Sequence, residues 1–208
     1  MTVRRAASAS ASAGGRGART GPPPQRWRSR ETDGSWSLCL PVGWAAIPVA
    51  DAAGAARVVT SLEAAQLGSG ADATLRRRVR GDLLRAARQA RGGGGRLLAV
   101  STAAVAGVPV DATLLVHVLP GLRHPGQSRR AALVRLAENL DGGKIAQLPA
   151  GPALRTVRGT DSTAVTVEYW VAGRARTYHL VLRSSLVALA EPLTALSDAV
   201  VETLAEGK

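Results

Sequence analysis

Two long stretches of the chain repeat their apolar residues at helical spacing. Between residues 72 and 91 the apolar positions recur every three or four residues, and Asp72 can cap the first turn. The stretch 186–205 repeats leucine and valine in the same way. Shorter patterns of this kind predict two further helices at 50–67 and 128–140.

Short runs rich in valine, leucine and threonine alternate with these helices and indicate strands. The Gly107-Val108-Pro109 break predicts one hairpin, and Gly173-Arg174 lies at the centre of a second. The predicted strands are residues 36–41, 96–106, 108–119, 144–149, 152–158, 164–171 and 176–183.

The order of these elements indicates the fold class. Hairpins follow one another directly, and helices are inserted between them, so neighbouring strands are expected to run antiparallel. We therefore predict an α+β fold, an α/β/α layered sandwich with a mostly antiparallel central sheet, rather than a doubly wound parallel sheet.

The first 34 residues have a different composition from the rest. Residues 1–34 combine alternating serine, alanine and glycine with three consecutive prolines and seven arginines, which predicts a disordered tail. Residues 35–208 are expected to form a single α+β domain. Arg4-Arg5 is not followed by the apolar core that a secretory signal needs. No apolar run approaches the roughly 18 residues of a membrane span, so we expect a cytoplasmic protein without membrane insertion.

The chain is strongly basic. It holds 27 lysines and arginines against 15 acids, a formal net charge of +12, and almost all of the cations are arginine. GC-rich coding alone produces such a bias, and an anionic partner is the other interpretation. The arginines opposite the apolar stripe of the helix at 72–91 form a candidate anion-binding face, which consists of Arg77, Arg78, Arg80, Arg85, Arg88 and Arg91. Aromatic residues, which stack on bases, make up only 3% of the chain.

One pair of residues could carry acid–base chemistry. A hairpin centred on Gly173-Arg174 places Glu168 opposite His179, and a carboxylate facing an imidazole can orient it for proton transfer. An ion pair on a half-solvated sheet face is the more ordinary interpretation. A hydrolase centred on this pair is therefore a minor hypothesis.

Motifs for other chemistry are not found in the sequence. The glycines at 92–95 are not followed by the Lys-Ser/Thr of a phosphate-binding loop, and there is no G-x-S-x-G elbow. One cysteine and three scattered histidines do not have metal-ligand spacing. We therefore predict no catalytic residues, no metal and no cofactor.

Four short segments carry a resemblance to a known group. LPVGW at 40–44, GVPV at 107–110, QLPAGPA at 147–153 and EYWV at 168–171 occur in succession before a last strand and an amphipathic helix. The chain resembles small actinobacterial proteins of the PsbP-like (Mog-type) α/β/α sandwich superfamily over about residues 36–206. The resemblance implies an assembly, adaptor or binding module, and it carries over no catalytic residue.

The sequence and the resemblance together favour a non-enzymatic protein-binding or adaptor domain. Its partner is expected to be another protein, one handled by a secretion or cell-envelope system. The alternative is a domain that binds an anionic polymer such as nucleic acid through the arginine-rich tail and the helix at 72–91.

Overall fold

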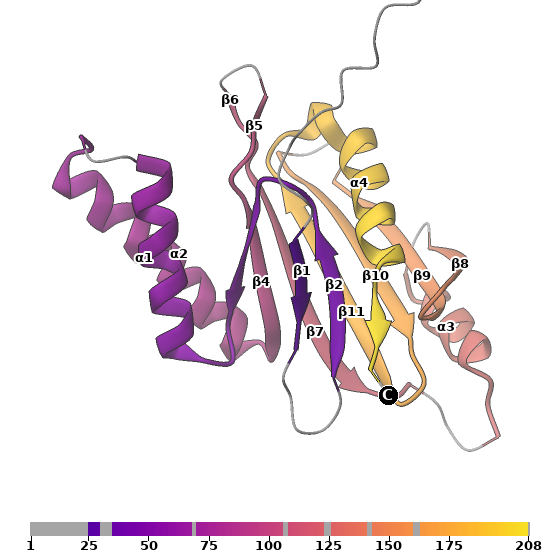
Figure 1. Ribbon diagram of the computed structural model, residues 1–208. Coiled ribbons are helices and arrows are strands. Elements are labelled where there is room, and N and C mark those ends of the chain that lie inside the picture. The colour runs from indigo at the N-terminus through magenta and orange to yellow at the C-terminus, as the bar shows by residue number, and fades with distance from the viewer. Residues whose placement is uncertain are drawn as a thin grey trace, which may run out of the picture.

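The computed structural model describes residues 25–29, 35–67, 70–105, 108–122, 126–140, 143–159 and 163–207. These residues form an α+β fold, as predicted, with four α-helices around a mostly antiparallel central sheet. Figure 1 shows the sheet at the centre of the molecule and the helices on its two faces.

The central sheet has seven strands, and every neighbouring pair is antiparallel. The predicted strands from residue 96 onward are confirmed, with ends shifted by a few residues. From one edge to the other, the strands are β3 (Trp44–Pro48), β4 (Gly95–Ser101), β7 (Ala112–Pro120), β11 (Arg176–Ser184), β10 (Val165–Ala172), β9 (Gly151–Arg158) and β8 (Lys144–Leu148).

A second, three-stranded sheet packs beside the first. It consists of β1 (Gln25–Arg28), β2 (Trp36–Leu40) and β12 (Ala205–Glu206), with β2 in the middle. The prediction of a disordered tail is wrong for β1, because these residues pair with β2 along their whole length. The rest of the predicted tail, 1–24 and 30–34, lies outside the described residues.

The helices begin close to where the sequence places them. α2 (Ala73–Gly92) is capped by the Asp72 carboxylate, which accepts the N–H groups of Thr74 and Leu75 at 2.9 and 3.2 Å. The other helices are α1 (Ala52–Leu67), α3 (Arg129–Ala137) and α4 (Ala190–Glu202), the last preceded by a 3₁₀ turn at Val187–Leu189. The prediction of one continuous helix over 186–205 is too long at both ends.

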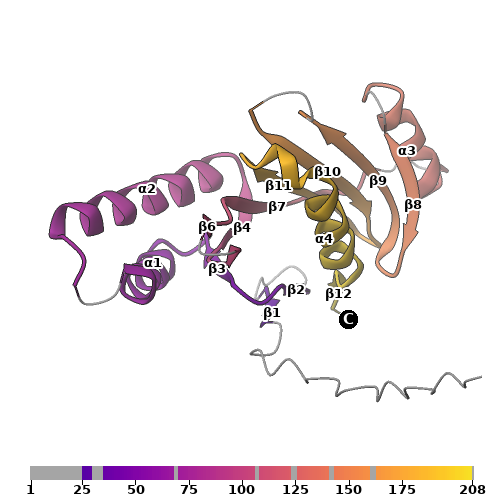
Figure 2. The ribbon, with the colours of Figure 1, turned by 90° about the horizontal axis from the view of Figure 1, so that it is seen from above.

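The helices and the small sheet cover the two faces of the central sheet as outer layers. On one face, α4 and β2 pack over the largest apolar cluster. On the other face, α1 and α2 cover β3 and β4, and α3 covers β9 and β10. In both views the hairpin of α1 and α2 projects beyond the β3 edge (Figures 1 and 2). The predicted α/β/α layering is confirmed.

β3 and the short strands β5 (Ala104–Val105) and β6 (Val108–Pro109) complete the described elements. β3 is not among the strands that the sequence predicts; Trp44 begins it, and it is the edge strand beside β4. Proline at the last position of β3 is compatible with an edge strand, because no strand in the described part of the chain pairs with the outer side of β3.

Candidate functional site

The predicted pair of Glu168 and His179 lies on adjacent strands but not in the predicted register. Ala172 pairs with Thr177 across the β10–β11 hairpin, so the turn is longer than the two residues that the sequence indicates. Val181 therefore faces Glu168, and Trp170 faces His179. Because the shift is by two residues, both predicted residues stay on the same face of the sheet.

The two side chains still meet, along the diagonal. Nε2 of His179 lies 3.2 Å from Oε2 of Glu168. The imidazole stacks on the ring of Trp170, with centroids 3.8 Å apart and planes 13° from parallel. The ring of His117 on β7 also stacks on the imidazole of His179, with the ring centroids 5.6 Å apart. The result is a partly buried cluster of two imidazoles, one carboxylate and one indole.

The electrostatics of this cluster favour neutral imidazoles. Burial lowers the pKa of His179 below its usual 6.5, and the hydrogen bond with Glu168 opposes this shift only in part. Burial also lowers the pKa of His117. None of the five main pockets in the described part of the chain is lined by Glu168 or His179. The hydrolase hypothesis therefore gains no support from this geometry.

The two histidines give a pH-dependent stability. Because their pKa values in the folded chain lie below 6.5, the unfolded chain binds more protons as the pH falls toward and below that value. We expect the free energy of unfolding to decrease from pH 7.5 to pH 5.5. Urea denaturation at intervals of half a pH unit measures how the free energy of unfolding depends on pH. The other charged groups beside the two histidines are Glu168, which contacts His179, and Arg158, which contacts Glu168.

The matched control for this prediction is the double variant His117→Gln/His179→Gln. Its unfolding free energy should change less between pH 5.5 and 7.5 than that of the wild type. Equal slopes in the two proteins would contradict a role for these imidazoles.

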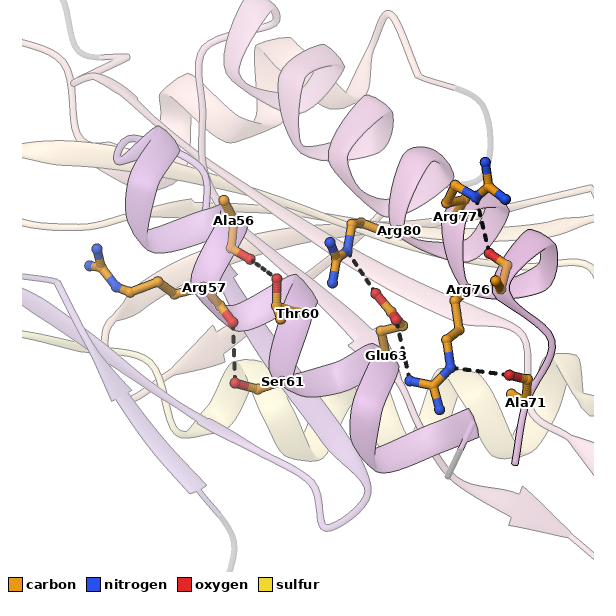
Figure 3. A network of polar contacts seen from close by, with 10 residues as sticks. Ala56, Arg57, Thr60, Ser61, Glu63, Ala71, Arg76, Arg77 and Arg80 are labelled. Atoms are coloured by element: carbon orange, nitrogen blue, oxygen red, sulfur yellow. Dashed lines mark hydrogen bonds and ion pairs between the residues drawn. The ribbon is translucent and has the colours of Figure 1, made fainter. Parts of the chain in front are cut away.

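The six arginines of the predicted anion-binding face are all exposed, but several have partners within the protein. Glu63 of α1 is only 5% exposed, and its carboxylate lies 2.7 Å from Nε of Arg80 and 3.6 Å from Nη1 of Arg76. Figure 3 shows these contacts between the two helices. A buried carboxylate needs such partners, since burying it unpaired costs several kcal/mol. Arg80 therefore helps to join α1 to α2.

Other members of the predicted anion-binding face are also engaged. Arg85 pairs with Asp82 at 3.0 Å, and Nε of Arg91 donates to the Val49 carbonyl at 2.8 Å. Nε of Arg77 donates to the Ala73 carbonyl one turn earlier. Only Arg78 and Arg88 have no polar partner among the described residues. Four of the six arginines therefore make polar contacts within the protein, and anion binding by this face stays a prediction.

A polar network fixes α4 to the central sheet. Its residues were not among the candidates predicted from the sequence. Nη1 of Arg155 on β9 lies 2.5 Å from Oδ2 of Asp198 on α4. The hydroxyl of Tyr169 on β10 donates a hydrogen bond to the other carboxylate oxygen. Burial, together with the Asp198 carboxylate, raises the pKa of Tyr169, so the phenol stays protonated and acts as a donor.

This network forms the floor of a pocket of about 400 Å³ between α4 and the β8 edge of the sheet. We call it the β8 pocket. Residues of four elements line it, both apolar and charged. They are Lys144, Ala146, Gln147 and Leu148 of β8, Ala153 and Arg155 of β9, Tyr169 of β10, and Asp198 and Glu202 of α4.

The strand beside this pocket has an open backbone edge. β8 is the last strand of the central sheet and pairs only with β9 in the described part of the chain. Gln147 lies opposite Pro152, which has no N–H, so this pair cannot exchange two backbone hydrogen bonds. The N–H and C=O of Gln147, and of Ile145 two residues earlier, therefore point away from β9. These groups can bond to an added strand.

Comparisons with known proteins include a distant structural similarity. No family model matches the chain, and no curated protein matches it in sequence. The fold is similar to the solution structure of cyanobacterial PsbP (CyanoP) from Synechocystis sp. PCC 6803, with 9% sequence identity and a TM-score of 0.42. The match covers 93% of this chain and 98% of that one. The actinobacterial, Mog-type refinement of the resemblance stays a prediction.

The described residues contain neither a candidate metal site nor a candidate membrane-spanning helix. No group of three or more histidine, cysteine, aspartate or glutamate side chains has the arrangement of a metal site within these residues. Among the helices described, none combines the length and the apolar character that crossing a membrane requires.

Proposed function

We propose that this chain is a non-enzymatic protein-binding domain that takes up an extended segment of a partner protein along β8. The observation that carries the proposal is the open edge of β8 beside the 400 Å³ β8 pocket. A segment added to this edge would extend the central sheet by one strand, with main-chain hydrogen bonds to Ile145 and Gln147.

The β8 pocket can select a side chain of the bound segment, which the backbone groups of an open strand edge alone cannot do. Side chains of an added strand alternate between the two faces of the sheet, so every second one would point toward α4. Ala146, Leu148 and Ala153 give that side chain an apolar wall. Lys144 and Glu202, of opposite charge, are also among its lining residues. Backbone bonds would then give affinity, and the pocket would select the side chain.

Nucleic-acid binding through α2 is less well supported. Arg80, Arg85 and Arg91 contribute contacts to the protein itself, and no aromatic residue lies between the arginines of this helix to stack on a base. An adaptor role in secretion or at the cell envelope, and a cytoplasmic location, remain predictions from the sequence.

The proposal is tested with peptides selected from a phage-displayed random library on the full chain. Gln147→Pro removes the outward N–H of β8 and leaves the β8–β9 ladder intact, because the N–H of Gln147 does not point at β9. We expect this variant to weaken binding of the selected peptides at least about tenfold, measured by fluorescence anisotropy.

Gln147→Ala is the matched control, because it keeps the N–H and removes a side chain on the face of β8 away from α4, the face that it shares with Ile145. It should bind the same peptides within about twofold of the wild type. Amide chemical shifts should move in β8 and α4 when a peptide is added. Selected peptides that bind Gln147→Pro as tightly as wild type, or a library that yields no binder, would overturn the proposal.

A further inference from the structure

Two charged side chains of the β8 pocket have no partner in the described structure. Arg155 is paired with Asp198, whose second oxygen accepts the Tyr169 hydroxyl. Lys144 and Glu202 also line the pocket, and both are exposed. Neither makes a hydrogen bond or an ion pair within the described part of the chain. One cation and one anion are therefore available to charges of a bound segment.

The helix α4 runs in the same direction as β8. Asp198 of this helix contacts Tyr169 within β10, and Glu206, which follows the helix, accepts the N–H of Arg174 beyond the end of β10. α4 therefore runs along β10 in the direction of the strand. β10 and β9 are antiparallel, as are β9 and β8, so β8 shares this direction.

This direction places Lys144 and Glu202 at different levels of the pocket. Lys144 pairs with Arg155, the partner of Asp198, so it lies at the level of Asp198. Glu202 follows Asp198 by one turn of the helix, about 6 Å. Ala146 follows Lys144 by about 7 Å along the strand and keeps the same face. Glu202 therefore lies at the level of Ala146.

Ala146 leaves room for a long side chain of the bound segment. It pairs with Ala153, so only methyl groups stand on the two outer strands at this level. A residue of an added strand directly opposite Ala146 would point to the same face, toward α4. A lysine or arginine there would lay its aliphatic stem along these methyl groups and bring its cation to the Glu202 carboxylate.

The positions on either side of this basic residue have different surroundings. An acidic residue is favoured opposite Lys144, because opposite charges attract across a strand pair and like charges repel. An apolar residue is favoured opposite Leu148, whose half-buried side chain packs against the largest apolar cluster. A basic residue at either position would lose these contacts.

We infer, on the basis of the proposed function, that the segment bound along β8 carries an apolar, a basic and an acidic residue at alternate positions. The apolar residue lies opposite Leu148, the basic one opposite Ala146 and the acidic one opposite Lys144. A segment antiparallel to β8 has them in this order from its N-terminus, and a parallel segment has them in the reverse order. The partner is thus a protein with an extended segment of mixed charge.

The peptides selected on the full chain provide the test. Their sequences should be enriched in this alternation. Glu202→Gln should weaken a peptide of this pattern about fivefold in fluorescence anisotropy, the upper value for a partly exposed ion pair. Glu191→Gln is the matched control, because Glu191 is exposed on α4, does not line the β8 pocket and carries the same charge. It should alter the affinity less than twofold.

A charge swap distinguishes a direct contact from a general effect of charge. Glu202→Arg should weaken the same peptide at least about tenfold. The variant should also bind a peptide whose basic residue is replaced by glutamate more tightly than the wild type does. An arginine in the last turn of α4 interacts favourably with the helix dipole, so the variant is expected to fold.

The outcomes separate this inference from the proposed function. Peptides that are weakened by Gln147→Pro but bind Glu202→Arg as tightly as wild type would overturn the inference and leave peptide binding along β8 in place. Peptides that bind Gln147→Pro as tightly as wild type, or a library that yields no binder, would overturn both.

Discussion

Trp36→Ala is expected to lower the free energy of unfolding by about 3–5 kcal/mol, the usual cost of removing a buried aromatic side chain. Trp36 is 1% exposed and lies in the largest apolar cluster. Its ring contacts that of Trp27 on β1, with centroids 4.5 Å apart, and that of Tyr178 on β11 at 5.9 Å. The side chain therefore joins the small sheet to the central sheet, and its loss leaves a cavity between them.

Urea denaturation of Trp36→Ala, Trp36→Phe and Val42→Ala gives a graded test. The indole nitrogen of Trp36 is buried without a hydrogen-bond partner in the described structure. Replacing Trp36 by phenylalanine therefore removes packing volume but no hydrogen bond. Trp36→Phe should therefore cost clearly less than Trp36→Ala. Val42 is 49% exposed, and its truncation should change stability by less than about 0.5 kcal/mol. A loss below about 1 kcal/mol for Trp36→Ala would contradict this packing.

The helices could be predicted because their signals are local. Asp72 and Ser128 each precede an apolar period, and both side chains accept the N–H bonds that an N-cap needs. The two strands of the β10–β11 hairpin could be predicted for the same reason, because buried and less buried residues alternate along most of each strand.

The register of that hairpin could not be predicted from Gly173-Arg174. A glycine and its neighbour fit a two-residue turn, but the longer turn lets Glu206 from β12 approach closely beside Gly173. The carboxylate of Glu206 accepts the N–H of Arg174, a contact across 32 residues. A turn whose length is set by a distant strand has no signature in its own residues.

β1 was missed for a related reason. Its four residues show no apolar period of their own, and arginines stand on both sides of Trp27. What holds this strand is its ladder with β2 and the contact of Trp27 with Trp36. A short strand of this kind gains its stability from tertiary packing, which composition does not reveal.

The candidate sites depend even more on long-range contacts. Glu168 and His179 could be found because they share one hairpin, and a two-residue error in register left them on one face. The β8 pocket could not be found from the sequence, since Asp198 is separated from Arg155 by 43 positions along the chain and from Tyr169 by 29. Only the packing of α4 brings them together.

The arginines of α2 illustrate what composition leaves undecided. Arg78 and Arg80 both belong to the basic face that the sequence predicts for α2. In the fold, Arg80 neutralises the buried Glu63 and Arg78 does not. The arginine content of α2 is thus partly structural, because the buried Glu63 is neutralised by Arg76 and Arg80 of the neighbouring helix.

Gly151→Ala is expected to cost at least about 3 kcal/mol of unfolding free energy. Gly151 has a φ of 142°, a conformation that side chains rarely adopt, and a Cβ there would lie against the carbonyl oxygen of Ala172 on β10. Backbone on both sides of the clash leaves little room for relaxation, so β9 would have to move away from β10. Gly94→Ala is the control, because Gly94 also has a positive φ, 78°, but its Cβ would meet nothing within 4 Å.

Gly94→Ala should therefore cost only the backbone strain of about 1–2 kcal/mol, and the difference between the two variants measures the clash at β10. Gly151 also begins β9, directly opposite the end of β8. We expect Gly151→Ala to lose stability and peptide binding together, and Gln147→Pro to lose peptide binding with less than about 1 kcal/mol of stability. Equal unfolding free energies for the two glycine variants would show that β9 and β10 are not as close as described.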